Sequence, residues 1–391
     1  MRTLLPPIMT TLAALLGSCA FHWEPAFDES AAPGAFDDVA IAAPDQALTF
    51  ARVRDPDTDA ARVIVVRSYQ GGTVVGVDAA ALLGRPVSSP LDLYRSLGHD
   101  TLARAAYEAP PGLVVTVPAT SLVAPLDLGD AHVAAGTNYP EHAGEAGVKD
   151  GPFLFSKLVR PTGPNAPVSA GAGLLDYEVE IAFVPLEPLR PGDRPQTMGL
   201  LLANDYTDRE TLLHAADPWD VASGKGFTTG KSFPSYLPVG NLLVIPRDLR
   251  AFVPDLQLEL YVNGALRQRE HARAMIWDLD EILAQTWARA PLRWEHRGAQ
   301  VGLLGDRQDL REDTLIVSGT PHGTVFAGVS KAQMARGTAR WALGGWSRPI
   351  PAHVVDAYVE AARAAGIYLK PGDEVVIHVD RLGVIRNRIT P

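Results

Sequence analysis

Two glutamates two residues apart give this sequence its first candidate chemistry. Glu178 and Glu180 lie in LLDYEVEIAF, residues 174–183, whose apolar residues alternate as on one face of a strand. Side chains two apart on a strand point the same way, so the carboxylates lie about 7 Å apart along it. A divalent cation that takes several carboxylate oxygens would cancel their repulsion. The alternative is a solvated strand face, because antiparallel sheets are commonly wet on one side.

A third carboxylate follows another apolar strand. The segment LLLANDYTDRE runs as a strand to Ala203, so Asp205 lies just past the strand end, where a side chain can point into a cleft. By itself Asp205 would be an ordinary turn or capping residue. Together with Glu178 and Glu180 it predicts an oxygen site suited to Mg²⁺, Mn²⁺ or Ca²⁺, and less to zinc, which prefers Cys and His.

Three further segments carry groups suited to acid–base or electrostatic work. His142 and Glu145 are three apart in NYPEHAGE, so on a short helix they share one face, and the carboxylate would make the imidazole a better base toward water. Lys231, in TTGKSFPSY, could stabilise a developing enolate. Thr320, in the VSGTPHG loop, could hold a substrate carboxylate together with backbone amides. An exposed His–Glu pair on a helix is the alternative for the first of these.

The elements that must position these residues fall into two parts. Residues 47–128 predict a small β-rich unit, with a Gly71-Gly72 hairpin and a helix over 89–109. From 129 to 391, short strands alternate with polar loops, and Asn263-Gly264 marks a hairpin. Helices are expected over 276–289 and 351–366, and the chain closes with a strand, a Gly turn and a strand. The expected class is α+β, mainly β.

Composition excludes several classes of protein. The 391 residues are 47% hydrophobic with a formal net charge of −10, which allows a large core and argues against a nucleic-acid binder. There is no G-x-S-x-G nucleophile elbow, so a serine hydrolase has no support. The segment GAGLLD lacks the rest of a dinucleotide-binding fingerprint.

The N-terminal segment contains the chain's one cysteine. After Arg2, the apolar run Leu4–Leu16 has the length of a secretory signal, and it ends in Leu16-Gly17-Ser18-Cys19. This resembles a bacterial lipobox, although a buried apolar N-terminus with a chance cysteine is the alternative. The interpretation makes 1–19 a lipoprotein signal peptide, Cys19 the lipidation site and 20–46 a flexible tether. We then expect export and lipid anchoring to a bacterial membrane, on its periplasmic or cell-surface face.

Taken in order, the segments of the C-terminal part resemble the fumarylacetoacetate hydrolase family over most of residues 130–391. Eight segments carry the resemblance: GTNYPEHAGE, FLFSKLVRPTGP, DYEVEIAF, NDYTDRE, GKSFPSYLPVGN, LYVNGALRQ, VSGTPHG and PGDEVVIHVDRLGVIRNRI. The resemblance implies a mixed β-sandwich roll over residues 129–391, a small N-terminal β-rich domain and a homodimer. It also implies roles for matching residues: metal ligation by Glu178, Glu180 and Asp205, water activation by His142 and Glu145, an active-site lysine at Lys231, and substrate contacts from Thr320, Arg209 and Lys157.

Among the departures from this family pattern, two concern whole segments of the chain. About 40 residues, near 329–368, separate the GTPHG loop from LKPGDEVV, and this insertion holds Trp341 and Trp346. It is expected to form a lid or a dimer contact. A lipoprotein signal is also unusual in a family best known from cytoplasmic metabolism, which puts the usual catabolic substrates in doubt.

These observations predict a metal-dependent hydrolase for a small oxo-acid substrate. The expected reaction cleaves a carbon–carbon bond in an acylpyruvate or β-diketo acid through a metal-stabilised enolate. The same apparatus would also serve a decarboxylase, isomerase or dehydratase of a 2-oxo acid or sugar acid. A membrane-tethered protein that binds a small acid without turnover is the non-enzymatic alternative.

Overall fold

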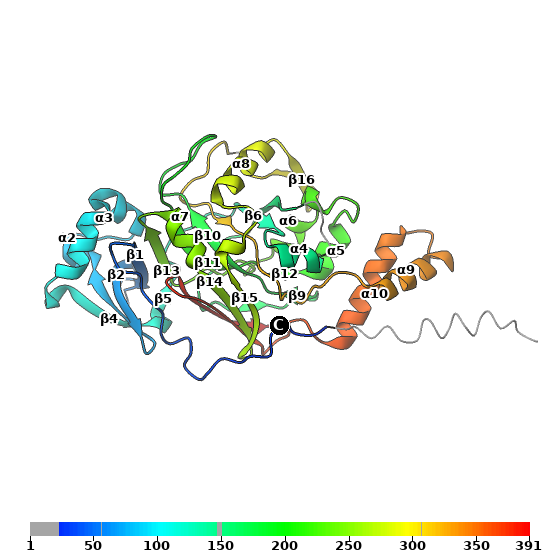
Figure 1. Cartoon of the computed structure of the whole chain (residues 1–391), viewed down its shortest axis with the longest axis horizontal. Helices are drawn as coiled ribbons and strands as arrows, with labels where there is room; N and C mark the ends of the chain where they lie inside the picture. Colours follow the sequence, from blue (N-terminus) through cyan, green and yellow to red (C-terminus); the bar gives the residue numbers. More distant parts are fainter. Residues whose placement is uncertain (1–22, 56, 147–150, 306) are drawn as a thin grey trace, which may run out of the picture.

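One long sheet of eleven strands crosses the molecule, with α-helices packed around it (Figure 1). This computed structural model describes residues 23–55, 57–146, 151–305 and 307–391. The strand order is β4-β3-β2-β1-β13-β11-β10-β18-β6-β7, with β5 beside β1, and only the β18–β6 pair is parallel. The strand bounds are β1 (Ala47–Arg54), β2 (Ala61–Gln70), β3 (Thr73–Asp78), β4 (Val114–Pro118), β5 (Leu122–Val123), β6 (His132–Gly136), β7 (Phe153–Lys157), β10 (Val179–Val184), β11 (Gly199–Asn204), β13 (Leu242–Pro246) and β18 (Ile316–Val317).

A second sheet packs against the long one. Its order is β15-β14-β19-β20-β8, and the predicted hairpin turn at Asn263 and Gly264 is present, with φ angles of 51° and 80°. Ile181 and Leu200 of the long sheet share one buried cluster with Leu258 and Ile377 of the second sheet, so the main core lies between the two sheets. The strands are β8 (Val168–Ser169), β14 (Gln257–Val262), β15 (Ala265–His271), β19 (Glu374–Val379) and β20 (Gly383–Thr390). This mixed, mainly β arrangement confirms the predicted fold class.

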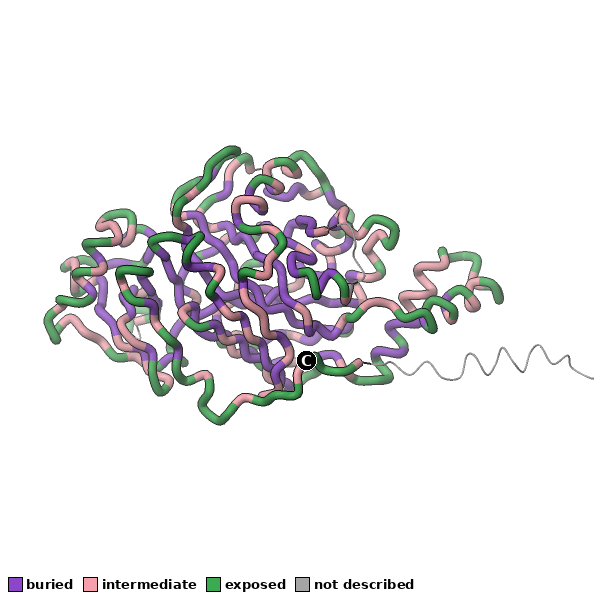
Figure 2. Tube along the Cα trace, in the orientation of Figure 1, coloured by how far each residue is buried: buried purple, intermediate pink, exposed green. Residues whose placement is uncertain are grey.

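The strand predicted over residues 174–183 is two strands. Residues 175–176 form β9 (Leu175–Asp176), which pairs with β12 (Thr207–Asp208), and Val179 begins β10. The break at Tyr177 and Glu178 occurs because the two halves pair with different neighbours. Both faces are buried, as the purple tube in Figure 2 shows for the centre of the molecule, so the solvated-face alternative for Glu178 and Glu180 is wrong.

The helices pack around the sheets (Figure 1), and the predicted ones are present. The helix expected over 89–109 is α3, which bends at Gly98 with φ 73°. The insertion near 329–368 forms a helical hairpin that projects from the body (Figure 1). The bounds are α2 (Ala79–Leu83), α3 (Pro90–Glu108), α4 (Pro140–Ala146), α5 (Arg209–Ala215), α6 (Phe227–Lys231), α7 (Leu249–Phe252), α8 (Leu279–Arg289), α9 (Lys331–Ala342) and α10 (Ile350–Ala365). A separate two-stranded ribbon joins β16 (Arg293–His296) to β17 (Ala299–Gly302).

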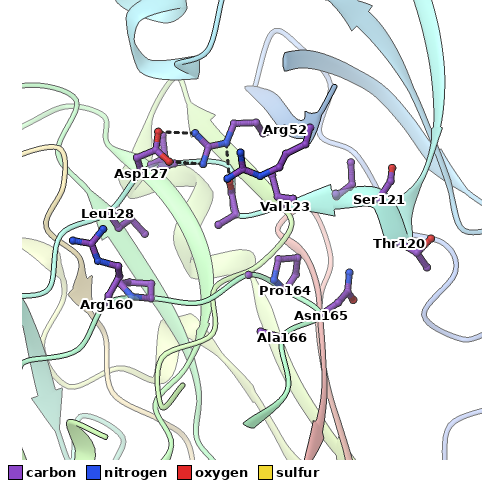
Figure 3. A pocket seen from close by; sticks show the side chains of 16 residues that line it. Arg52, Thr120, Ser121, Val123, Asp127, Leu128, Arg160, Pro164, Asn165 and Ala166 are labelled. Carbon is purple, nitrogen blue, oxygen red and sulfur yellow. Dashed lines mark hydrogen bonds and ion pairs between the residues drawn. The ribbon is translucent and has the colours of Figure 1, made fainter. Parts of the chain in front are cut away.

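The N-terminal unit is continuous with the rest of the long sheet. Strand β1 pairs with β13 over five residues, so the sheet does not break at the boundary expected near residue 128. At the same seam, buried Arg52 donates to both carboxylate oxygens of Asp127, at 2.9 and 2.8 Å (Figure 3). A cavity of about 450 Å³ opens beside this pair and is lined also by Arg160 and Asn165. Because Asp127 and the Ala124 carbonyl satisfy Arg52, we interpret the pair as a structural clamp.

The segment expected to be a flexible tether is packed where the structure describes it. Within residues 23–46, Val39 and Ala42 are buried, Glu29 pairs with Arg269 at 2.9 Å, and Ala31 donates to the Gly264 carbonyl. These contacts are scattered along the segment and follow no period, so no sequence pattern predicts them. The signal peptide and Cys19 lie outside the described residues. Among the described residues, none of the helices is long and apolar enough to cross a membrane.

Candidate active site

The three predicted carboxylates meet in the buried centre of the catalytic part. Glu178 and Glu180 flank the start of β10, and Asp205 follows the end of β11, the strand paired with β10. One oxygen from each carboxylate lies within 4.8 Å of the others, and all three residues are buried. The antiparallel register explains the meeting, because it places Asn204 and Asp205 beside Val179 and its neighbours.

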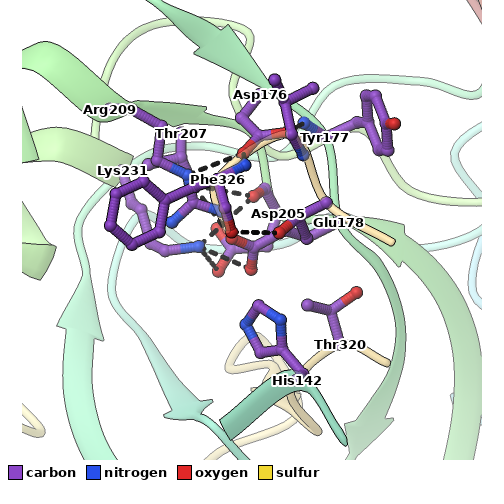
Figure 4. Close-up of polar contacts among 12 residues, drawn as sticks. His142, Asp176, Tyr177, Glu178, Asp205, Thr207, Arg209, Lys231, Thr320 and Phe326 are labelled. Atoms are coloured by element: carbon purple, nitrogen blue, oxygen red, sulfur yellow. Dashed lines mark hydrogen bonds and ion pairs between the residues drawn. The ribbon is translucent and has the colours of Figure 1, made fainter. Parts of the chain in front are cut away.

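Three buried cations surround this cluster, as Figure 4 shows for Lys231 and Arg209. Lys231, the last residue of α6, lies 2.7 Å from Glu178 Oε2 and 2.8 Å from Asp205 Oδ2. Lys157, at the end of β7, pairs with the other oxygen of Asp205. Arg209 lies 2.5 Å from Glu178 Oε1. The structure thus places Lys157 and Arg209 at the site, bound to its carboxylates, and their contact with substrate stays a prediction.

The environment affects the two glutamates in opposite ways. Burial alone would raise the pKa of Glu178, but Lys231 and then Arg209 outweigh it and lower the pKa to about 2. Burial raises the pKa of Glu180 well above its usual value, and the neighbouring charges of Asp205 and Glu178 raise it further. Glu178 is therefore held as an anion, whereas the charge on Glu180 lacks compensation.

The free oxygen of Glu180 fits a bound cation. Its Oε2 accepts a hydrogen bond from the Gly319 amide at 2.5 Å, but buried Oε1 has no hydrogen-bond partner among the described residues. A buried, unpartnered carboxylate oxygen is costly unless a ligand completes it. The donor set consists of carboxylate oxygens alone, which suits Mg²⁺, Mn²⁺ or Ca²⁺. The site thus fits one divalent cation held by Glu178, Glu180 and Asp205.

His142 and Glu145 are brought together loosely on α4. The closest approach, between His142 Nδ1 and Glu145 Oε2, is 3.5 Å, and Nδ1 has no hydrogen-bond partner among the described residues. Both oxygens of Glu145 instead lie 3.2 Å from the Gly323 amide. In Figure 4 the imidazole faces the carboxylate cluster from the side opposite Arg209 and Asp176. The ring therefore lies beside the carboxylates (Figure 4), and its role in activating water stays a prediction.

The predicted substrate residue Thr320 is already engaged by the protein. Its hydroxyl donates to the Val179 carbonyl at 3.0 Å and accepts from Gln268 Nε2 at 2.9 Å. Gln268 also accepts from the Val179 amide at 3.0 Å, so it fixes the loop to the start of β10. Thr320 lies at the site, and its role toward substrate stays a prediction.

Sequence reasoning missed two buried residues beside the site. Asp176 accepts from Arg209 at 2.8 Å and from the amides of Val325 and Phe326 at 3.0 and 3.2 Å. It lies two residues before Glu178 on the same polar face, and that spacing was the available signal. Tyr139 is buried with its hydroxyl unpartnered among the described residues. Burial and then the charge of Glu180 raise its pKa, and nothing in its sequence context distinguished it from a core tyrosine.

Solved structures share this fold. A fumarylacetoacetate hydrolase from Exiguobacterium antarcticum superposes with a TM-score of 0.53 at 20% identity, covering 88% of this chain and 99% of its own. A 2-hydroxyhepta-2,4-diene-1,7-dioate isomerase from Mycobacterium marinum gives a TM-score of 0.51 at 19% identity, covering 88% and 98%.

Sequence comparison extends the likeness to the family. Rat mitochondrial oxaloacetate tautomerase Fahd2a is 24% identical over 74% of this chain and 75% of its own. A Burkholderia multivorans protein described only as a hydrolase is 30% identical over 39% of this chain, and the match spans 54% of that protein. The model of the fumarylacetoacetate hydrolase C-terminal domain matches residues 131–390. With that match over more than half of its length, the chain belongs to the fumarylacetoacetate hydrolase family.

Proposed function

We propose that this enzyme is a metal-dependent hydrolase that cleaves a carbon–carbon bond in an acylpyruvate or another β-diketo acid. The observation that carries the proposal is the free, buried oxygen of Glu180 within a three-carboxylate cluster that an imidazole faces. A divalent cation such as Mg²⁺ or Mn²⁺, held by Glu178, Glu180 and Asp205, would supply positive charge to balance negative charge that develops on the substrate.

The chain's own residues account for the rest of the reaction. Lys231 keeps a positive charge beside Glu178 and Asp205, which favours negative charge developing on a substrate. Its pKa is raised, because the attraction of Asp205 and Glu178 outweighs burial, which by itself lowers it. His142 takes a proton from water, and the water attacks the distal carbonyl. Glu145 orients the imidazole when the distance between His142 Nδ1 and Glu145 Oε2 shortens from 3.5 Å to a hydrogen bond. The bond between the attacked carbonyl carbon and its neighbouring carbon then breaks, and the imidazolium of His142 returns the proton to the departing carbon, so the products are a carboxylic acid and a 2-oxo acid.

A second candidate is isomerisation or tautomerisation of a 2-oxo acid. Two observations favour it: the loose His142–Glu145 contact, and relatives named as an oxaloacetate tautomerase and a dienedioate isomerase. Such a reaction moves a proton and needs no activated water, so His142 would exchange protons with the substrate carbon instead. Decarboxylation and sugar-acid dehydration use the same cation site and remain further alternatives, as does binding without turnover.

The deciding experiment follows two substrates in the ultraviolet. Acylpyruvates lose their enol absorbance when cleaved and yield two acids, whereas enol-oxaloacetate loses its absorbance on conversion to the keto form without cleavage. Each reaction would be measured with Mg²⁺, with Mn²⁺ and with chelator, in the wild type and in His142→Gln. Metal-dependent formation of two acids, lost in His142→Gln, would support the hydrolase. Tautomerisation without cleavage would overturn it in favour of the second candidate.

We also propose that the enzyme is exported and lipid-anchored at Cys19. The support is the lipobox-like sequence Leu16-Gly17-Ser18-Cys19 after an apolar run. Labelling of expressing bacteria with a radioactive fatty acid should mark the wild type and not Cys19→Ser. Equal labelling of the wild type and Cys19→Ser, or labelling of neither, would contradict the proposal.

A further inference from the structure

The helical hairpin of α9 and α10 is attached to the body at its base. Tyr358 of α10 is buried and packs edge-on against Phe326, with the ring centroids 5.6 Å apart. Arg363 pairs with Glu210 of α5 at 2.5 Å. Farther out, the two helices touch closely, because a Cβ on Gly337 would come within 2.5 Å of the Val354 amide. The outer half therefore projects as a defined element, which Figures 1 and 2 show extending from the body with exposed green segments.

The tip of this hairpin carries an unusual surface. Leu343 and Trp346, in the turn between the helices, are 72% and 71% exposed. The stretch from 331 to 350 contains four basic residues and no Asp or Glu, in a chain of net charge −10. Two carboxylates of α10, Asp356 and Glu360, pair with three of these basic side chains and leave the hairpin positive. Exposed Trp and Leu beside basic residues are typical of elements that lie in a membrane interface.

The described chain begins beside the base of this hairpin. The ring of Trp23 lies 5.3 Å below the Arg267 guanidinium, and Trp23, Gly366 and Ile367 line one cavity at the end of α10. Cys19 is four residues earlier, a distance of at most about 14 Å along an extended chain. Helix α10 has 16 residues, a length of about 24 Å. A membrane that holds Cys19 is thus close to the base of the hairpin and within reach of its tip.

We propose that the α9–α10 hairpin is a membrane-contact element that docks on an anionic bilayer. Leu343 and Trp346 enter the interface, and Arg340 and Arg348, on either side of them in the sequence, lie near the lipid headgroups. The inference rests on the proposed anchoring at Cys19 and is independent of the reaction catalysed. A second copy of the chain is a poorer occupant, because a stable interface buries about 800 Å² on each partner and this convex tip offers only a few exposed apolar side chains.

The first test reads the environment of the tip in the full chain. In a Cys19→Ser background, Ser347→Cys supplies the protein's one thiol, to which an environment-sensitive fluorophore is attached. Vesicles of phosphatidylcholine with phosphatidylglycerol should raise its fluorescence at least about twofold and shift it to the blue, and vesicles of phosphatidylcholine alone should do so less. The matched control is Ser88→Cys, an exposed position between α2 and α3 at the opposite end of the molecule, which should not respond (Figure 1).

Two results would overturn the proposal. One is an unchanged signal at position 347 in the presence of the anionic vesicles, whether or not the protein floats with them. The other is a rise without lipid that grows with protein concentration, which would assign the tip to a second copy. As a second test, Leu343→Ser with Trp346→Ser should weaken flotation with anionic vesicles about tenfold, and Trp219→Ser, an exposed tryptophan elsewhere, should not. Metal-dependent turnover in detergent should be unchanged in both variants. A failure of the membrane-contact proposal can therefore be distinguished from a failure of the proposed reaction.

Discussion

At the scale of single residues, Glu180 distinguishes this site from a set of buried ion pairs. Glu178 and Asp205 each contact lysine or arginine, whereas Glu180 contacts a backbone amide and leaves one oxygen free. Replacing Glu178 or Asp205 would leave a buried lysine or arginine without its partner, in addition to changing the metal site. Glu180 can be changed without leaving a buried cation unpaired, so it gives the cleanest test of metal binding.

We predict that Glu180→Gln binds Mn²⁺ much more weakly than the wild type. The loss should exceed the factor of about 10 to 100 that is typical when a residue supporting a metal ligand is replaced. Without metal, the variant should melt at a higher temperature than the wild type, because it removes a buried charge crowded by Asp205 and Glu178. Isothermal titration with Mn²⁺ and thermal melts would measure both effects. The control is Glu187→Gln, the same change at an exposed position after β10. Wild-type affinity in Glu180→Gln would exclude this residue as a ligand.

The raised pKa of Glu180 predicts a pH-dependent response to metal. Since its folded pKa lies above the unfolded value, about 4.3, its contribution to stability is intact below that value and is lost as pH rises through the folded pKa. A divalent cation binds the charged form and compensates for it. Saturating Mg²⁺ should therefore raise the melting temperature more at pH 8 than at pH 5.5. Melts with Mg²⁺ or chelator across this range would reveal it, and an equal shift at every pH would contradict it.

At the scale of elements, one loop after β18 connects three acids of the site. Within residues 318–326, the amide of Gly319 donates to Glu180, that of Gly323 to Glu145, and those of Val325 and Phe326 to Asp176. The loop can turn its amides inward because Gly319 and Gly323 have φ angles of 86° and 96°. The same loop leads into the α9–α10 hairpin through Phe326.

Gly319→Ala should therefore damage the site through the backbone. A Cβ there would lie 2.8 Å from Asn138 Cβ, and the positive φ adds strain, so we expect a cost of about 1–3 kcal/mol in unfolding free energy and weaker Mn²⁺ binding. Urea unfolding and titration calorimetry would measure the two effects. Gly298→Ala is the matched control, since Gly298 has φ 80° with nothing within 4 Å of the added Cβ. Similar losses in both variants would show that strain alone, without the close contact, is responsible.

At the scale of the whole molecule, the N-terminal unit completes the long sheet. Strand β13 lies between β11 and β1, so removing the unit would expose β13 as an apolar edge. A chain of residues 129–391 alone should therefore aggregate, which size-exclusion chromatography beside the full chain would show. A soluble, metal-binding fragment would mean that β1 is dispensable.

The family resemblance also predicts a homodimer. Sedimentation equilibrium of the full chain in detergent should give twice the mass of one chain, after correction for the bound detergent. A chain of 41.8 kDa that stays at one copy over the whole range of concentrations would contradict the prediction. Repeating the run with Trp346→Ser should leave the mass unchanged, because the hairpin tip is assigned to the membrane.

The sequence by itself determined many of the elements, and it led to the proposed site residues. Alternation, glycine turns and capping residues are local signals, so β1, β2, β3 and the Asn263-Gly264 hairpin follow from neighbouring residues. The carboxylates, the dyad and Lys231 were proposed from their residue types, from the alternation that puts Glu178 and Glu180 on one strand face, from the place of Asp205 just past a strand end, and from the order of motifs along the chain.

Only the tertiary structure decided how those residues are charged, paired and joined. Whether Glu180 is free while Glu178 is paired depends on Arg209, Lys231 and Gly319, which come from three separate segments. The continuity of the sheet through β1 and β13, and the packing of residues 23–46, likewise depend on contacts between distant segments. Burial and electrostatic interaction arise only when such segments meet, and a linear pattern does not record them.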